Sequence, residues 1–173
     1  KGGGRGGPRR SADADPDRFP LYVAGLFIVV AVGLFGVTAF ELWWRPGPFS
    51  VIALLNSNLE IGDYPQLLLP GQNVTLYVLL EDHMNQVMLY MVSVSVLNAS
   101  EPPQPSSLGR ALYSYNLYVV AYDGENVTAP VKLVAPSRPG QYKLLLLLYY
   151  YNWTARSFYY SGLFNQIYFN VTS

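Results

Sequence analysis

The chain has 173 residues, with 11 basic and 11 acidic side chains and no cysteine. Only 13% of the residues are charged, against about 25% in ordinary soluble domains. The lack of cysteine excludes disulfide bonds, thiolate catalysis and the usual structural zinc sites. From Ser50 onward the five basic and seven acidic residues are spread thinly, so this part has no basic patch for nucleic acid.

Residues 1–18 form a Gly-rich segment with five basic side chains. Such a segment buries too little apolar surface to fold alone, which predicts a flexible cytoplasmic tail. A second interpretation is an arm that binds acidic lipid headgroups or a partner. Because the sequence begins with Lys1 rather than Met, we expect that it lacks the natural N-terminus.

A transmembrane helix is expected over residues 19–44. Phe19–Phe40 contains no charge, and at about 1.5 Å per residue it matches a hydrocarbon core of about 30 Å. Trp43 and Trp44 follow, and we expect both at the membrane–water interface. Five basic residues before the span, against Arg45 after it, predict a cytoplasmic N-terminus and an extracellular C-terminal part. A cleaved signal peptide is the alternative, although its apolar region is usually shorter.

The segment 45–49 is interpreted as a linker, and residues 50–173 as an extracellular domain. Strand-like runs alternate there with turn signals such as Pro70-Gly71 and Asp123-Gly124. This pattern predicts an all-β fold, an immunoglobulin-like β-sandwich of about seven strands. The candidate strands are Ser50–Asn56, Gln66–Leu69, Val74–Leu80, Val87–Leu97, Ala111–Tyr122, Val127–Val134, Tyr142–Tyr151 and Gln166–Val171.

One candidate strand is apolar on both faces. Lys143 is followed by five leucines and three tyrosines, although one face of a sandwich strand usually carries polar residues toward water. Loops or tyrosine rings of the same chain could cover the outer face, or that face could meet another protein or the bilayer. We favour a partner interface here, formed by Leu144, Leu146, Leu148, Tyr150, Phe158, Tyr159 and Tyr160.

The domain contains five Asn-x-Ser/Thr sequons, where chance would give about one. All of them follow the expected span, which agrees with the orientation from the charges. We therefore expect covalent N-glycans on the translocated surface. The acceptor residues are Asn73, Asn98, Asn126, Asn152 and Asn170.

The inventory for catalysis is small. His83 is the only histidine, and Glu81 would point to the same side of its strand. A closed metal site needs three or four ligands, and the sequence has no nucleophile elbow of the G-x-S-x-G kind. We interpret His83 as part of a solvated hairpin turn and expect no catalytic residue, no metal and no cofactor.

Short motifs resemble an archaeal family of uncharacterised membrane proteins. Phe49–Tyr90, with Gly62-Asp63-Tyr64-Pro65 and Pro70-Gly71, is similar to the outer domain of the family catalogued as domain of unknown function 1616. The later segment from Gly140-Gln-Tyr-Lys-Leu through Phe158-Tyr159-Tyr160, together with Ile167–Val171, looks like its closing strands. The family often has Asn-His-Glu where Glu81-Asp82-His83 stand, and its members often carry several membrane helices. The resemblance implies archaeal origin and architecture, and it brings no activity.

These observations favour a non-enzymatic, membrane-anchored accessory or interaction subunit of a membrane or cell-envelope assembly. Its expected partners are the lipid bilayer and other membrane or cell-surface chains, among them a second copy of itself. The alternative is a carbohydrate- or surface-layer-binding module that uses exposed tyrosine and tryptophan rings as stacking platforms. A hydrolase that uses His83 is a third, weaker interpretation.

Overall fold

The computed structural model describes residues 27–33 and 47–172. The chain divides into two compact units, Lys1–Gly47 and Pro48–Ser173. In the first unit, residues 27–33 are helical. Among the described residues, no helix is both long and apolar enough to cross a bilayer. The predicted tail, most of the predicted span 19–44 with Trp43 and Trp44, and the first two linker residues lie outside the described residues.

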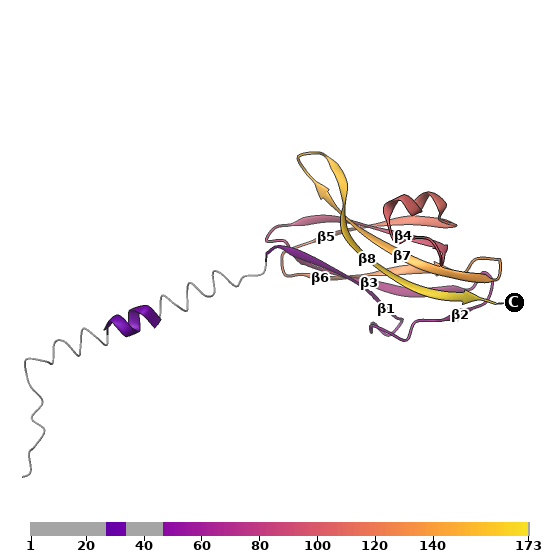
Figure 1. Ribbon diagram of the computed structural model, residues 1–173, viewed down its shortest axis with the longest axis horizontal. Coiled ribbons are helices and arrows are strands. Elements are labelled where there is room, and N and C mark those ends of the chain that lie inside the picture. The colour runs from indigo at the N-terminus through magenta and orange to yellow at the C-terminus, as the bar shows by residue number, and fades with distance from the viewer. Residues whose placement is uncertain (1–26, 34–46, 173) are drawn as a thin grey trace, which may run out of the picture. The chain divides into compact units, whose positions relative to one another are not determined.

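The second unit consists of two β-sheets and one short 3₁₀ helix (Figure 1). The three-stranded sheet has the order β1-β3-β6, and the five-stranded sheet has the order β2-β8-β7-β4-β5. The elements are β1 (Phe49–Leu55), β2 (Leu67–Leu68), β3 (Asn73–His83), β4 (Met88–Asn98), η2 (Pro105–Arg110), β5 (Tyr113–Ala121), β6 (Asn126–Val134), β7 (Gly140–Asn152) and β8 (Ser157–Val171).

The all-β prediction is confirmed, and each candidate run overlaps one of the eight strands. The strand pairs are antiparallel except for β2 with β8. β8 begins nine residues before the expected Gln166, at Ser157. The sheet accommodates the intervening Ser161-Gly162 as an irregularity opposite Leu147 and Tyr149 of β7.

The main core lies between the two sheets. Alternate residues of the central strands point into it, as the two-residue period of a strand requires. From the three-stranded sheet come Leu76, Val78, Leu80, Val131 and Leu133, and from the five-stranded sheet come Val92, Val94, Val96, Leu144, Leu146 and Leu148.

The prediction of Leu144, Leu146 and Leu148 as partner contacts is wrong. All three side chains are fully buried in the main core. A shift of one residue moves a strand's entire side-chain set to the opposite face, and the outward face of β7 carries the odd-numbered residues instead. The leucines predicted at the surface are therefore part of the interior.

The outward leucines, Leu145 and Leu147, are also fully buried, in a second and smaller cluster. Leu97 of β4 completes its floor, and Leu108 and Ala111 pack over it from η2 and the residue that follows. The chain between β4 and β5 thus covers half of the outer face. Of the two interpretations of this apolar strand, cover by the same chain is the correct one at the leucines.

A buried lysine fixes this covering segment. Lys143 is 1% exposed, and its Nζ donates a hydrogen bond to the backbone carbonyl of Glu101. Burial lowers the pKa of Lys143, and the carboxylate of Glu101 opposes that shift. The same carboxylate forms an ion pair with Arg110 at 2.8 Å. Lys143 therefore connects β7 to Glu101, near the start of the covering segment, and Arg110 connects the end of η2 to Glu101 as well.

Two tyrosines connect the sheets along one side. β5 and β6 are edge strands of different sheets, and an edge leaves backbone groups without ladder partners. The hydroxyl of Tyr113 accepts a hydrogen bond from the Val134 amide at 2.6 Å, and that of Tyr115 accepts one from the Lys132 amide at 2.7 Å. Burial raises the pKa of both tyrosines. These hydroxyls accept hydrogen bonds from backbone amides of β6 that a neighbouring strand would otherwise accept.

Candidate functional site

The candidate site is an aromatic surface on the outer face of the five-stranded sheet, beyond the part that η2 covers. We define the aromatic surface as Tyr118, Tyr149, Tyr151, Trp153, Phe158 and Tyr160. The strand register explains its composition: Met91 of β4 pairs with Tyr118 on one side and Tyr149 on the other, and Tyr149 pairs with Tyr160. Directly paired residues share a face, so the rings lie side by side.

Four of the six rings contact one another in a continuous chain, and the other two form a pair. Ring centroids are 5.8 Å apart for Tyr118 and Phe158, 5.1 Å for Phe158 and Tyr151, and 4.8 Å for Tyr151 and Trp153. Tyr149 and Tyr160 form a further pair at 5.5 Å. Tilted and edge-to-face pairs at such distances attract through the ring quadrupoles. The surface is therefore a packed layer and not a set of independent side chains.

The irregularity in β8 positions this surface. Gly162 has φ +85°, a backbone conformation that side-chain-bearing residues rarely adopt. The hydroxyl of Ser161 donates to the Leu148 carbonyl at 2.7 Å and accepts from the Leu163 amide at 3.1 Å. Bulges bend and twist a hairpin, and the tip of the β7–β8 hairpin projects beyond the sheets (Figure 1). The bend carries Tyr151, Trp153 and Phe158 out with the tip.

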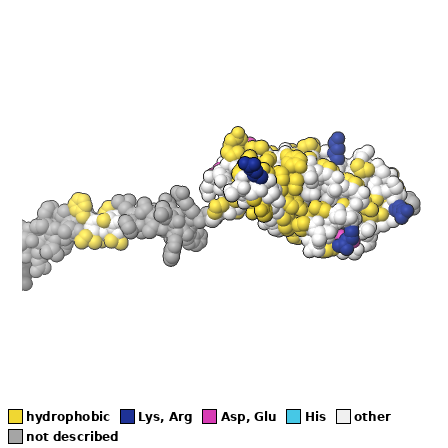
Figure 2. Space-filling model, turned by 90° about the horizontal axis from the view of Figure 1, so that it is seen from above, with side chains coloured by type: hydrophobic (Ala, Val, Ile, Leu, Met, Phe, Trp, Pro, Cys, Tyr) yellow, Lys and Arg dark blue, Asp and Glu magenta, His cyan; other side chains and the backbone are white. Residues whose placement is uncertain are grey.

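Two rings of the aromatic surface are open to solvent, and the other four are half-buried. Trp153 is 67% exposed and Tyr118 is 62% exposed, and Val120 and Tyr122 extend the surface along β5 with 54% and 62% exposed. Figure 2 shows hydrophobic side chains gathered in a broad band on the side of the hairpin and η2. Exposed apolar patches of this kind mark interaction sites in soluble domains.

Two tyrosines at the centre of the surface, Tyr149 and Tyr160, stay uncharged at physiological pH. Burial raises the pKa of Tyr149 and of Tyr160, and the neighbouring Tyr160 adds to the effect at Tyr149. Both hydroxyls remain protonated and can donate or accept a hydrogen bond. Flat rings with a polar edge suit association with another macromolecule, because apolar area and hydrogen bonds come from the same side chain.

The structure separates the predicted partner residues. Phe158 and Tyr160 belong to the aromatic surface. Tyr150 and Tyr159 form a stacked pair at 6.2 Å, but they alternate with those residues and lie on the other face. Sequence reasoning missed Tyr118, Tyr149, Tyr151 and Trp153. The signal for Tyr149 and Tyr151 was present as every second residue of β7, but the sequence did not show which set faces outward.

His83 packs against an aromatic ring at the end of its strand. It ends β3, and its ring stacks on Phe49 with centroids 4.6 Å apart. Within residues 27–33 and 47–172, no three acidic or histidine side chains are grouped to hold a metal ion. In the described part of the chain, the geometry around His83 is that of a packed strand end.

A buried polar network lies beside His83, and sequence reasoning did not find it. Asp82 is fully buried, and its Oδ1 accepts hydrogen bonds from the Tyr90 hydroxyl at 2.9 Å and the Met84 amide at 3.0 Å. The Tyr90 hydroxyl also contacts Ser50 Oγ at 2.6 Å. Because the single proton of Tyr90 goes to Asp82, Ser50 is the donor in this second bond. The network joins β1, β3 and β4.

Burial is the largest cause of a strongly raised pKa at Tyr90. The hydrogen bond from Ser50 opposes the shift, and the Asp82 hydrogen bond and charge reinforce it. Asp82 Oδ2 is buried and has no hydrogen-bond partner among the described residues. Burying a carboxyl group costs free energy unless it is hydrogen-bonded, and Tyr90 is the side-chain donor that Asp82 has beside the Met84 amide.

The five sequon asparagines lie at or near strand ends. Asn73, Asn98, Asn126 and Asn170 are exposed, whereas Asn152 is half-buried. The Oδ1 of Asn152 accepts hydrogen bonds from the Thr154 and Ala155 amides and forms the hairpin turn. Four of the five side chains are thus accessible for modification.

No protein-family model and no curated protein matches the sequence. Among solved structures, the chain is similar to a β-glucosidase from Listeria innocua in complex with isofagomine, with 12% identity and a TM-score of 0.46, over 72% of this chain and 16% of that chain. It is also similar to AvmM, which catalyses macrocyclization in alchivemycin A biosynthesis, with 11% identity and a TM-score of 0.39, over 72% of this chain and 89% of that one.

A third similar structure is Spo0M, a sporulation control protein from Bacillus subtilis, with 12% identity and a TM-score of 0.38, over 75% of this chain and 51% of that one. The chain spans about a sixth of the glucosidase that it matches. Likenesses at these TM-scores define neither a family nor an activity for this protein.

Proposed function

We propose that this protein is a non-enzymatic accessory or interaction subunit of a membrane or cell-envelope assembly, and that the aromatic surface binds another polypeptide of that assembly. The observation that carries the proposal is the contrast between the two halves of one sheet face. The chain covers Leu145 and Leu147 with its own η2 segment, and on the adjoining aromatic half it leaves Tyr118 and Trp153 exposed and the other rings half-buried.

The composition and shape of the open half favour a protein partner. A large apolar side chain gains roughly 1.5–3 kcal/mol when it is fully buried, so leaving a contiguous set in water is costly unless a partner covers it. Tyrosine and tryptophan are enriched at protein interfaces, and charged residues are depleted at their centres. The rings come from β5, β7, β8 and the hairpin turn, so they form a broad surface and do not line a narrow groove.

The remainder of the proposal comes from the sequence. Phe19–Phe40 is long and apolar enough to anchor the chain as a transmembrane helix, with the basic tail in the cytoplasm and the domain outside. The two-sheet domain would be an immunoglobulin-like sandwich that carries N-glycans, and the family resemblance suggests an archaeal source. A membrane anchor raises the effective concentration of lateral partners, so a modest interface suffices.

The test is site-specific photo-crosslinking in native membranes. A photoreactive phenylalanine analogue is placed at Tyr118 or at Phe158 in the full chain. The control position is Lys132, which is exposed on β6 of the other sheet. We expect one discrete adduct with another polypeptide from both aromatic positions and none from Lys132. Equal crosslinking from all three positions, or no adduct from either aromatic position, contradicts the proposal.

A second candidate function is carbohydrate binding. The observation that favours it is Trp153, whose ring stands 67% exposed at the tip of the hairpin. Aromatic rings stack on the apolar faces of pyranoses as well as on protein. Retention of the purified full chain on cell-envelope polysaccharide, lost in Trp153→Ala and kept in Tyr122→Ala, would favour this alternative over the protein partner.

A further inference from the structure

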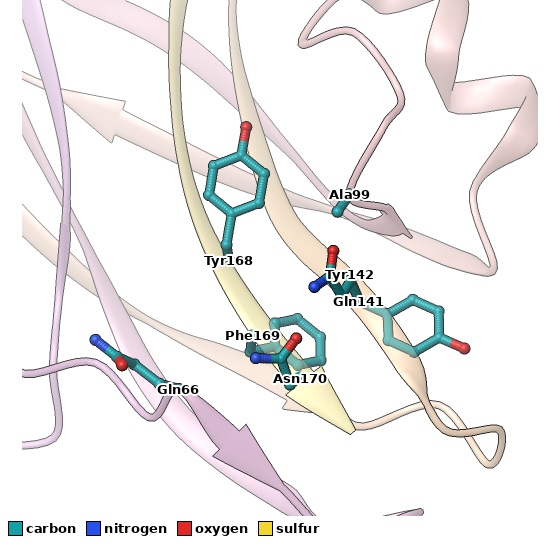
Figure 3. Close-up of a pocket in the computed structure, with 7 residues that line it drawn as sticks. All are labelled: Gln66, Ala99, Gln141, Tyr142, Tyr168, Phe169 and Asn170. Atoms are coloured by element: carbon teal, nitrogen blue, oxygen red, sulfur yellow. The ribbon is translucent and has the colours of Figure 1, made fainter. Parts of the chain in front are cut away.

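A cavity lies away from the aromatic surface, at the opposite end of β8 (Figure 3). This cavity of about 400 Å³ is lined by residues from the chain before β2, the end of β4, the start of β7 and the end of β8. Its polar lining consists of three primary amides, Gln66, Gln141 and Asn170, together with the hydroxyl-bearing ring of Tyr168. Among the residues that the structure describes, no charged side chain lines it.

The ring of Tyr168 is held in place although it is 54% exposed. Its hydroxyl accepts a hydrogen bond from Gln166 Nε2 at 3.1 Å. The ammonium of the buried Lys143 lies 5.8 Å from its ring centroid, and that ammonium is itself bound to the Glu101 carbonyl. Such a ring loses little freedom when a ligand packs on it. Tyr168 is therefore a preorganised stacking platform.

The chemistry of this lining suits a neutral sugar. Primary amides offer both donors and acceptors, which match the hydroxyl and acetamido groups of a pyranose. An aromatic ring offers an apolar face for the C–H bonds of the sugar ring.

One lining residue is also a sequon acceptor. Asn170 and Tyr168 are separated by one residue of β8 and lie on the same exposed face. The backbone N–H of Asn170 donates a hydrogen bond to the backbone carbonyl of Gln66 at 2.8 Å, and Asn170 of β8 pairs with Gln141 of β7 in the sheet. A sugar attached to Asn170 Nδ2 would begin inside the cavity, with Tyr168 beside it and amides on the neighbouring segments.

We infer that the cavity holds the first sugar of an N-glycan attached to Asn170, stacked on Tyr168. The inference rests on the N-glycosylation included in the proposed function, and it adds a defined place and a stabilising role for one glycan. Of the two sources of a pyranose, the attached glycan is favoured over a free sugar because the acceptor atom belongs to the lining.

The test compares sequon-blocking variants of the native glycoprotein. Thr172→Ala prevents modification of Asn170 and leaves every lining residue unchanged. Thr128→Ala does the same for Asn126, which has Gly124 in place of a tyrosine two residues earlier. Glycopeptide mass spectrometry establishes occupancy, and thermal unfolding is measured for each variant with Tyr168 intact and with Tyr168→Ser.

We expect Thr172→Ala to lower the Tm by roughly 3 °C, the size that one aromatic contact gives in a domain of this length. In the Tyr168→Ser background the loss should vanish, and Thr128→Ala should show no dependence on Tyr168. Protein made in a host without N-glycosylation should show no effect of Thr172→Ala at all, which separates the glycan from the threonine side chain.

Three outcomes would overturn the inference. The first is an equal Tm loss from Thr172→Ala in both Tyr168 backgrounds. The second is a bare Asn170 in native protein whose other sequons carry sugar, which removes the inference and leaves the extracellular placement intact. The third is Tyr168-dependent binding of free N-acetylglucosamine by the native glycoprotein, detected by calorimetry, because an occupied cavity cannot accept it.

Discussion

Leu146 and Leu147 are neighbours on β7, both are fully buried, and they face opposite sides of the sheet. Leu146 packs between the two sheets, whereas Leu147 is covered by the η2 segment. If that segment packs as tightly as a sheet does, Leu146→Ala and Leu147→Ala should destabilise the domain equally. Each should cost about 2–5 kcal/mol, the sum of lost apolar transfer and the cavity left behind.

The assay is urea unfolding of the full chain in detergent, followed by tryptophan fluorescence and supported by thermal melts. A loss of 3 kcal/mol corresponds to a fall in Tm of roughly 10–15 °C for a domain of this size. Val120→Thr is the control, because Val120 is 54% exposed on the same face and its loss should change the free energy of unfolding by no more than about 0.5 kcal/mol. A cost below about 1 kcal/mol for Leu147→Ala, beside the full cost for Leu146→Ala, would refute a tightly packed cover.

Two further predictions concern buried polar groups. Tyr90→Phe should cost about 1–3 kcal/mol at neutral pH, because Asp82 loses its hydroxyl donor in the interior, whereas Tyr122→Phe, at an exposed ring, should be nearly neutral; equal values in chemical denaturation would contradict the network. Burial lowers the pKa of Lys143 in the folded protein below its ordinary 10.5. Between that lowered pKa and 10.5, the unfolded chain binds more protons than the folded protein does. The stability of the wild type should therefore rise with pH in this window relative to that of Lys143→Met. A stability difference that stays flat over this window would show that Lys143 is not buried in solution.

The strand positions could be predicted from the sequence because they follow from local patterns. Gly-, Pro- and Asp-rich turns bound runs of Val, Leu and Tyr, and each run became a strand. The weak point was the segment from Ser157 to Asn165. Ser161-Gly162 resembles a turn, and only the register with β7 shows that Gly162 is an irregularity within one long strand.

The site was less predictable because it depends on which face of β7 points outward. Leu144–Leu148 is apolar at every position, so alternation carries no information there. Which face of β7 points outward is set by its pairing with β4, in which Ser93 pairs with Leu147 and Ser95 pairs with Leu145. The sequence also did not predict that Leu108 covers Leu145 and Leu147, because the Pro/Ser-rich chain between β4 and β5 looks like an ordinary loop.

The position of β8 has a consequence for the order of folding. β8 lies between β7 and β2 in the five-stranded sheet, yet it follows every other strand in the sequence. A ribosome delivers β7, with its five leucines, before the strand that pairs along its free edge exists. β2 pairs with β8 alone among the strands, at a separation of about one hundred residues, so it too must wait. Until synthesis reaches Val171, the nascent domain presents an open, leucine-rich edge of the kind that recruits strands from other chains. The time between the emergence of β7 and of β8 is therefore the interval in which this protein most needs a chaperone.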